Sequence, residues 1–358
     1  MSFGSISLGS IIGFIAGISL FVIAVLMDDP KNPFVFLDHG VKIGDKCTIK
    51  SGVRIGSGVQ IGDHTTIREN SVIGGQGFGV ERSENNQTMK IPHIGGVQIG
   101  SYVEIGAINT VVTGTIKPTI IGDYVKTDDH VHIAHNCKIG KGTLITACAE
   151  LSGSVTIGKN AEIMECCIVR GPFAMGEGTV LKMGAKIYSN TTLGPFCKVG
   201  GEVNNVVFQG FSSKAHDGFL GNSVIGEWCN LGADSNNSNL KNNYAEVKLW
   251  GYASGRFQNT GLQFCGLIMG DHSKCGINTM FNTGTVVGVS ANIFGAGFPR
   301  NFIPSFSWGG SAGFSTYKTE KAFEVAEIVM QRRNKSFDEQ EENILSHIFK
   351  LTKTYRKA

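Results

Sequence analysis

The sequence predicts an all-β solenoid, in which short parallel strands stack around one apolar interior. Aliphatic residues recur at every sixth position through much of its 358 residues, 49 residues are Gly, and only 17% are charged. Gly is about twice as frequent as the usual ~7%. A disordered chain would carry more charge and less hydrophobicity, and a net charge of +3 gives no reason to expect a nucleic-acid partner. The glycine excess therefore indicates repeated turns.

The six-residue period fits a strand and does not fit a helix. Side chains alternate between the two faces of an extended chain, so every sixth residue points to the same side. Each hexad is then a short strand and a turn, and hexads must stack because none buries its aliphatic residue alone. The frame consists of Ile43, Ile49, Ile55, Ile61, Ile67 and Ile73, of Ile99, Ile105 and Val111, of every sixth residue from Ile121 to Val199 with only Thr127 off pattern, and of Ile225, Leu231, Met269, Cys275, Phe281, Val287 and Ile293.

Turns are expected between these strands. Gly follows many of the aliphatic residues, as in Ile43-Gly44 and Ile55-Gly56, and we expect these glycines to supply the positive φ that a sharp bend requires. Stacked hexads of this kind resemble the left-handed parallel β-helix of hexapeptide-repeat proteins. The resemblance implies the left-handed sense and three hexads per triangular coil. We expect this β-helix over residues 36–165 and 166–303.

Three segments leave the frame, namely residues 74–98, 203–222 and 236–262. Insertions into a solenoid gather on one face, and that face often binds ligands. We therefore expect these excursions to lie beside a functional site.

The pattern changes after Pro304, and helices are predicted within residues 316–358. Thr319 is expected to cap a first helix, and Ser336 with Glu339 has the spacing of a capping box for a second. Apolar residues recur at helical spacing in both segments. We expect the helices to cover the last coil, whose free strand edge would otherwise pair with another chain.

Residues 1–30 are predicted to form an apolar helix. Leu8–Met27 is an uncharged, largely apolar run, long enough at ~1.5 Å per residue to cross a bilayer. We expect membrane contact through residues 8–27, which would attach a cytoplasmic protein to the inner membrane. An apolar cap on the first coil is the alternative. A signal peptide fits poorly, because a basic start and an A-x-A cleavage site are absent.

The nine cysteines form no C-x-x-C pair, so neither a zinc ribbon nor a thioredoxin-type site is indicated. Several take positions that elsewhere hold Val or Ile. We expect them to be small, reduced core residues, which fits a cytoplasmic location. No bound metal is expected.

Residues 36–165 carry motifs of a known family. They are GQGFG at 75–79, KIP at 90–92, GGVQIG at 95–100 and VHIAHN at 131–136. This part of the chain resembles UDP-3-O-acylglucosamine N-acyltransferase of lipid A synthesis, and the resemblance implies that His135 is a general base. The chain departs from the family in three ways. Asp128-Asp129 stands where the family has Asp-Asn, the family's Arg after the IGA-type hexad is replaced around Thr113, and the family's uracil-binding N-terminal domain has no counterpart here.

Residues 166–355 resemble a second family, the acetyltransferase half of bifunctional N-acetylglucosamine-1-phosphate uridyltransferase, in a variant group common in Bacteroidetes. The motifs are KAHDGFLG at 214–221, VIG at 224–226 and NLGA at 230–233. The resemblance implies site roles for His216 as the catalytic base, Asn239 as the thioester-polarising residue, Asn230, Lys186 and Phe219 as acceptor contacts, and Ala233 as a CoA contact. The nucleotidyltransferase signature is absent, so we expect no uridyl transfer.

The chemistry also follows from residue types. Acyl transfer from a thioester needs a base with a pKa near 7, which suits His, and hydrogen-bond donors for the oxyanion, which Asn or turn amides supply. A covalent nucleophile is unnecessary when both substrates are held together. No tightly bound cofactor is expected, since acyl-CoA or acyl-ACP is a co-substrate.

We therefore expect an acyltransferase that moves an acyl group to an amino sugar or nucleotide sugar. The resemblance implies a homotrimer, because such enzymes place the acyl-donor groove between subunits. Two other classes remain open. One is a non-catalytic, membrane-tethered scaffold or sugar-nucleotide-binding module. The other is a γ-class carbonic anhydrase, for which His130, His135 and His93 have a suitable spacing, although the family's Arg-Gly-Asp stretch is absent.

Overall fold

The structure is a computed structural model that describes residues 34–356. The predicted apolar helix over residues 1–30 lies outside the described residues, so its membrane contact stays a prediction. Within residues 34–356, no helix combines the length and the apolar character that crossing a membrane requires.

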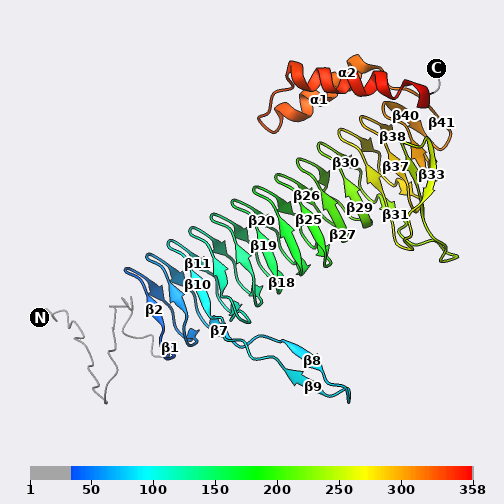
Figure 1. Cartoon of the computed structure of the whole chain (residues 1–358). Coiled ribbons are helices and arrows are strands. Elements are labelled where there is room, and N and C mark those ends of the chain that lie inside the picture. Colours follow the sequence, from blue (N-terminus) through cyan, green and yellow to red (C-terminus); the bar gives the residue numbers. More distant parts are fainter. Residues whose placement is uncertain (1–33, 357–358) are drawn as a thin grey trace, which may run out of the picture.

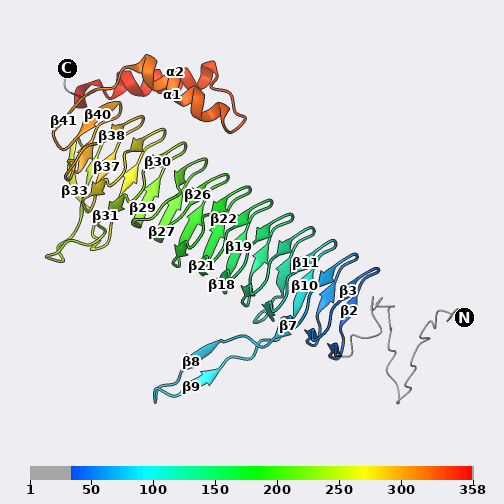
Figure 2. The ribbon, with the colours of Figure 1, turned by 180° about the vertical axis from the view of Figure 1, so that it is seen from behind.

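The described chain forms one long parallel β-solenoid with a helical pair alongside its upper coils (Figure 1). As a rule each strand pairs in parallel with the third solenoid strand after it, as Ile43 does with Ile61 and Ile49 with Ile67. Three hexads therefore make one coil, as predicted. Figure 2 shows the same stack from behind.

The strands are short because each hexad contributes only one side of a coil. The lower strands are β1 (Phe36–Leu37), β2 (Lys42–Ile43), β3 (Thr48–Ile49), β4 (Arg54–Ile55), β5 (Gln60–Ile61), β6 (Thr66–Ile67), β7 (Val72–Gly75), β10 (Val97–Ile99), β11 (Glu104–Ile105), β12 (Thr110–Val112), β13 (Thr119–Ile121), β14 (Lys126–Thr127), β15 (His132–Ile133), β16 (Lys138–Ile139), β17 (Leu144–Ile145), β18 (Glu150–Ser152), β19 (Val155–Ile157) and β20 (Glu162–Ile163). The upper strands are β21 (Ile168–Arg170), β22 (Phe173–Met175), β23 (Val180–Leu181), β24 (Lys186–Ile187), β25 (Thr191–Leu193), β26 (Lys198–Val199), β27 (Glu202–Phe208), β28 (Ser213–Lys214), β29 (Phe219–Ile225), β30 (Asn230–Leu231), β31 (Asn236–Asn237), β34 (Ile268–Met269), β35 (Lys274–Cys275), β36 (Met280–Phe281), β37 (Val286–Val287), β38 (Asn292–Ile293), β39 (Phe302–Ile303) and β40 (Ser307–Gly310).

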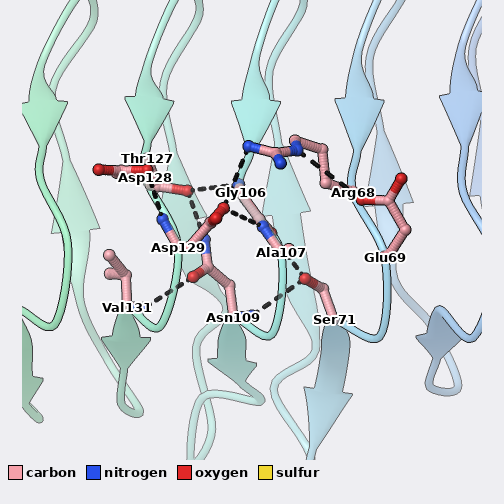
Figure 3. A network of polar contacts seen from close by, with 10 residues as sticks. All are labelled: Arg68, Glu69, Ser71, Gly106, Ala107, Asn109, Thr127, Asp128, Asp129 and Val131. Atoms are coloured by element: carbon pink, nitrogen blue, oxygen red, sulfur yellow. Dashed lines mark hydrogen bonds and ion pairs between the residues drawn. The ribbon is translucent and has the colours of Figure 1, made fainter.

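The predicted aliphatic frame is the core. One apolar cluster extends from Ile43 to Ile303 and passes residue 165 without a break. Thr127, the one residue off pattern between Ile121 and Val199, is also buried, and its hydroxyl accepts hydrogen bonds from Asn109 and from the Gly106 amide. The polar exception is therefore satisfied inside the coil (Figure 3).

The role predicted for the glycines after the aliphatic residues is wrong. Gly44 and Gly56 do not have positive φ; an added Cβ would lie 2.3 Å from Asp63 Oδ1 or 2.5 Å from the Gly74 oxygen in the next coil. These glycines permit close stacking of coils. Positive φ occurs three positions after the aliphatic residue instead, and there it is carried by Gly and by many other residue types, including Tyr102.

The coil has three corners, which we name after one residue each. Backbone hydrogen bonds stack Tyr124, Phe196, Phe211 and Trp228 at the Tyr124 corner, and Cys148 and Cys166 at the His130 corner. The His135 corner contains Gly153, whose position lies against the His135 ring, and further up it contains Asn222 and Asn239, which are joined by a 2.7 Å hydrogen bond.

Two of the three predicted excursions exist, and both leave from the His135 corner. The first carries the hairpin of β8 (Val80–Arg82) and β9 (Thr88–Lys90) and returns at the Gly96–Gly114 bridge. The second, between Asn239 and Cys265, carries β32 (Lys248–Gly251) and β33 (Arg256–Asn259). Figure 1 shows both on the same side of the solenoid.

The excursion predicted within residues 203–222 is wrong. β27 and β29 pair in parallel from Glu202 with Phe219 to Phe208 with Ile225, so this segment stays in the coils. Ile187 pairs with Val203 and Leu193 with Phe208, offsets shorter than three full hexads. The frame is lost here because residues are missing from the coil.

The end of the solenoid differs from the prediction. β41 (Gly313–Thr316) turns back and pairs antiparallel with β40, so it covers the last strand edge of that sheet. The helices α1 (Thr319–Gln331) and α2 (Glu339–Leu351), followed by a 3-10 turn (Lys353–Tyr355), run back beside the upper coils instead of covering the end (Figure 1). They pack on the Tyr124 corner, where Phe306 forms a buried cluster with Ala322 of α1 and Leu345 of α2. The connection between the helices also lies there, with Lys335 Nζ 5.8 Å from the Phe211 ring centre.

The predicted helix caps are also corrected. Lys318, not Thr319, precedes α1 and makes no side-chain cap. Asp338, not Ser336, caps α2 by accepting a hydrogen bond from the Glu341 amide. The Asp338 carboxylate satisfies one of the free amides in the first turn of α2, which lies two residues further along the chain than the amide that the predicted box would reach.

The cysteine prediction holds for seven residues and fails for two. All nine thiols are free, and Cys148 and Cys166 are exposed at the His130 corner. These two occupy corner positions with positive φ. A side chain at such a position points away from the interior of the coil, so these two thiols stay exposed.

Candidate active site

His135 lies at the corner from which both excursions leave the solenoid. It lies two residues after the end of β15, is half-buried, and precedes Asn136, whose φ is +60°. The tight bend places the two side chains side by side at the base of the β8–β9 excursion, so the expected association of the excursions with a candidate site is seen.

Asn136 fixes the His135 ring. The Thr115 amide donates to Asn136 Oδ1 at 2.9 Å, and Asn136 Nδ2 lies 3.1 Å from both Thr115 Oγ1 and His135 Nδ1. A backbone N–H can only donate, so the Asn oxygen must face Thr115 and the Asn amide nitrogen must face the ring. The imidazole is thus held by its Nδ1 atom.

A second histidine packs on the first. His93 is only 2% exposed, and its ring centre lies 4.9 Å from that of His135. Gln76 holds the His93 backbone at both polar groups, through Nε2 to the oxygen at 2.9 Å and Oε1 to the amide at 3.1 Å. From its spacing in the sequence, His93 is expected only as a possible zinc ligand. The motif from Lys90 to Pro92, which directly precedes His93, is the sequence feature that could have placed His93 near His135.

The environment lowers the pKa of His135. Burial of the ring is the main cause, and positive charge on His93 or His132 would oppose its protonation further. The neutral imidazole is therefore favoured at pH 7, which is the form that accepts a proton.

Glycines allow backbone to approach the two rings. An added Cβ at Gly77 would lie 2.6 Å from His93 Nε2, and one at Gly153 would lie 2.9 Å from His135 Cε1. A shallow pocket of about 380 Å³ opens next to them, lined by Gln76, Gly77, Phe78, Gly79, Val80, Thr88 and Lys90. Gly77 and Gly79 of this lining also lie against the His93 ring, so a ligand in this pocket would be separated from His93 by the backbone of these two glycines.

The second predicted base, His216, lies at the His130 corner and is exposed. Behind it, Lys214 takes a core position and is 1% exposed; its ammonium donates to the Gly200 and His216 oxygens at 3.0 and 2.9 Å. Burial lowers the pKa of Lys214 to about 8, although Asp217 opposes this change. A buried cation therefore fixes the bend that carries His216.

The other predicted residues of this site are divided between two corners. Phe219 and Asn239 meet over Gly221, where an added Cβ would lie 2.5 Å from the Phe219 ring and 2.8 Å from Asn239 Nδ2. The backbone of β29 separates them from His216. The single chain therefore does not bring His216 and Asn239 together.

Three predicted residues lie apart from this pair. Ala233 stacks above the bend of His216 at the His130 corner, as Asp234 bonds to Asp217. Asn230 is exposed on β30. Lys186 is exposed on β24, where Glu202 of β27 is its partner in the parallel pairing.

The two candidate centres are well separated. His135 and His216 lie about five coils apart, which is roughly 24 Å at ~4.8 Å per coil. One small substrate cannot contact both histidines, so they belong to two sites.

The zinc-ligand set of the carbonic anhydrase alternative is not assembled. His130 lies at a different corner from His93 and His135. Within residues 34–356, no three His, Cys, Asp or Glu side chains are placed to hold a metal ion. The acidic residue of the His130 corner, Asp129, pairs with Arg68 at 3.1 Å and accepts from the Ala107 amide (Figure 3).

Comparison with known proteins agrees with the first resemblance. The family described as "Bacterial transferase hexapeptide (six repeats)" matches residues 33–75 and 118–153, and the second range contains His135. UDP-3-O-acylglucosamine N-acyltransferase of Bordetella pertussis is 33% identical over 162 residues, 44% of this chain and 40% of the relative. The Coxiella burnetii enzyme of the same name is 43% identical over 158 residues, 41% and 45% of the two chains.

A solved structure of a UDP-N-acetylglucosamine acyltransferase from Bacteroides fragilis covers 46% of this chain and 66% of its own, at 21% identity and a TM-score of 0.38. The chain spans less than half the length of the curated relatives it matches. Residues 33–75 and 118–153 match the bacterial transferase hexapeptide family, and over the aligned span the chain is similar to UDP-3-O-acylglucosamine N-acyltransferases.

Proposed function

We propose that the protein is an acyltransferase that moves an acyl group from acyl-CoA or an acyl carrier protein to an amino sugar or nucleotide sugar, with His135 as the general base. One observation carries the proposal. His135 is a half-buried imidazole with a lowered pKa, held by Asn136 at the corner where both excursions leave the coils.

The reaction needs no covalent intermediate. The acceptor amine or hydroxyl attacks the thioester carbonyl, His135 takes its proton, and the departing thiolate receives that proton. A neutral imidazole suits the first step and its imidazolium the second. The pocket beside Gly77 and Gly79 offers close backbone approach for one of the substrates.

The proposal also includes a second acceptor site, a homotrimeric assembly and attachment to a membrane. The exposed Lys186 and the Phe219–Asn239 contact are proposed to serve a second acceptor site that a neighbouring subunit of a homotrimer would complete. Residues 8–27 are proposed to attach the protein to the inner membrane from the cytoplasmic side. The similarity to UDP-3-O-acylglucosamine N-acyltransferases supports a UDP-linked amino sugar as the acceptor.

The test is product analysis by mass spectrometry, with panels of acyl-CoA and acyl-ACP donors against UDP-sugar acceptors. We expect His135→Ala to lower kcat by at least about 100-fold, the scale of general-base catalysis. His216→Ala, made separately, measures the second site. His347→Ala, an exposed histidine on α2, is the matched control. Full activity in the double variant His135→Ala/His216→Ala would disprove the assignment.

A non-catalytic binding module is the second candidate. The exposure of His216 and the division of its partners between two corners favour it for the upper half of the solenoid. Tight binding of a sugar nucleotide without turnover of any donor would establish this function instead.

A further inference from the structure

We propose that His93 and His135 form a hydrogen-bonded dyad, in which His93 Nε2 accepts the Nε2–H of His135 and holds that ring for proton transfer at Nδ1. The role of the dyad in acyl transfer rests on the proposed function. Its existence does not, because it can be measured without turnover.

The first step is the proton on His93. Its Nδ1 atom lies 2.9 Å from the Ile91 oxygen, and a carbonyl oxygen can only accept. His93 therefore carries its proton at Nδ1 and a lone pair at Nε2. That Nε2 atom is buried and has no hydrogen-bond partner, so it is an acceptor without a donor, which folded proteins seldom leave unused.

The second step is the proton on His135. The Thr115 amide orients the Asn136 side chain so that its NH2 group faces His135 Nδ1 at 3.1 Å. His135 Nδ1 must then accept, and the proton of the neutral ring lies at Nε2. Flipping the Asn136 amide would set its NH2 group against the Thr115 N–H.

The two rings are thus complementary, since one has a free acceptor and the other a free donor. Their centres are 4.9 Å apart, with a tilt of 59°. His93 is buried and tied at Gln76 and Ile91, whereas His135 is half-buried. His135 is therefore the ring that shifts to close the hydrogen bond. It keeps its Nδ1 contact with Asn136 as the pivot, and the missing side chain of Gly153 leaves room beside its Nε2 edge.

The charges around the pair explain why a neutral acceptor matters. The titratable groups that act on His135 are His93 and His132, and within residues 34–356 no carboxylate forms an ion pair with either ring. In a serine-protease triad a carboxylate accepts the second N–H of the base. Here the His93 lone pair takes that place.

The assignment fixes the route of the proton. The N–H or O–H of the acceptor replaces the Asn136 amide hydrogen at His135 Nδ1 and passes its proton there. The new C–N or C–O bond forms at the thioester carbonyl, the C–S bond breaks, and the thiolate leaves with the proton from Nδ1. His93 keeps its own proton throughout, so it is a positioning residue.

The direct test is magic-angle-spinning NMR of the full chain labelled with 15N-histidine. We expect His135 protonated at Nε2, His93 protonated at Nδ1, and a hydrogen-bond coupling between the two Nε2 atoms. His93→Gln and His135→Gln assign the signals, and His347→Ala leaves them unchanged. A His135 ring protonated at Nδ1, or the absence of the coupling, would overturn the dyad.

The functional test compares two substitutions of His93. His93→Gln keeps an acceptor oxygen near the position of Nε2, whereas His93→Phe removes it. We expect His93→Gln to keep kcat within about tenfold and His93→Phe to lose about 100-fold with KM unchanged. Equal losses in both would show that His93 does not act as an acceptor. If His93→Phe does not fold, the coupling between the two Nε2 atoms in the wild-type chain still decides whether His93 accepts the hydrogen bond of His135. Inactive wild-type protein with an intact dyad would refute only the proposed function.

Discussion

Replacing Lys214 by Met should show by how much the burial of the Lys214 ammonium lowers the free energy of unfolding. Burial lowers the pKa of Lys214 from 10.5 to about 8, which corresponds to about 3 kcal/mol at ~1.36 kcal/mol per tenfold change. Below pH 8 the amine is charged in the folded and unfolded states, and the whole penalty opposes folding. Above pH 10.5 it is neutral in both. Between these values the unfolded chain binds the extra proton, so the free energy of unfolding should rise with pH.

The Lys214→Met variant removes this pH-dependent contribution and adds a constant one. The Gly200 and His216 oxygens lose their donor, at about 1–3 kcal/mol for each unsatisfied group. At pH 7 the two effects offset each other, so the variant should have nearly the stability of the wild type. From pH 8 to 10.5 the wild type should gain about 3 kcal/mol relative to the variant.

Urea unfolding followed by tryptophan fluorescence measures this difference. The three tryptophans of the chain, Trp228, Trp250 and Trp308, all lie after Lys214 in the upper coils and their hairpin, so the signal reports the part of the solenoid that holds the lysine. Other groups titrate in this range in both proteins and cancel in the difference. Parallel stability curves for wild type and Lys214→Met would refute the reasoning.

Three further predictions concern the candidate site and the surface. Gly153→Ala should lower kcat by at least tenfold, because the new Cβ would lie 2.9 Å from His135 Cε1 and a 1 Å displacement of a catalytic group costs ~100-fold in rate. Gly58→Ala is the matched control for backbone strain, since Gly58 has a φ of +71° and open space around it. Equal kcat values in the two variants would contradict the predicted clash. Because the pKa of His135 is lowered from 6.5, its neutral base form persists below that pH. The acid limb of the kcat/KM profile should therefore lie below pH 6.5, and an acid limb above pH 6.5 would exclude His135 as the general base. In the folded protein, Cys148 and Cys166 should react rapidly with a thiol reagent while the buried cysteines react only on unfolding, and mass mapping of labelled peptides checks this.

The core could be predicted from the sequence because burial follows the six-residue period directly. Even Cys275 and Phe281, which are not typical of the frame, lie in the core at the predicted positions. The function of a glycine could not be predicted in the same way. The pair Ile43-Gly44 shows where a small residue is required, but the requirement comes from Asp63 in the next coil, and the period does not show which contact excludes the side chain.

The misassigned segments have a related cause. A break in the period at residues 203–222 is compatible with an insertion or a deletion, and only the pairing of β27 with β29 shows that the coil is shortened. The partnership of His93 with His135 was missed because the β8–β9 excursion precedes His93, so the period no longer gives its register relative to His135.

The unbroken ladder of coils also sets a length scale. Because backbone hydrogen bonds join each coil to the next along the whole stack, the distance between His135 and His216 cannot change by bending at a hinge. It can change only by whole coils, in steps of ~4.8 Å, since a partial coil would turn one histidine to another side of the triangle. Loss or duplication of one complete coil between the two sites would therefore change their separation by a fixed step, while the local surroundings of each site remain the same.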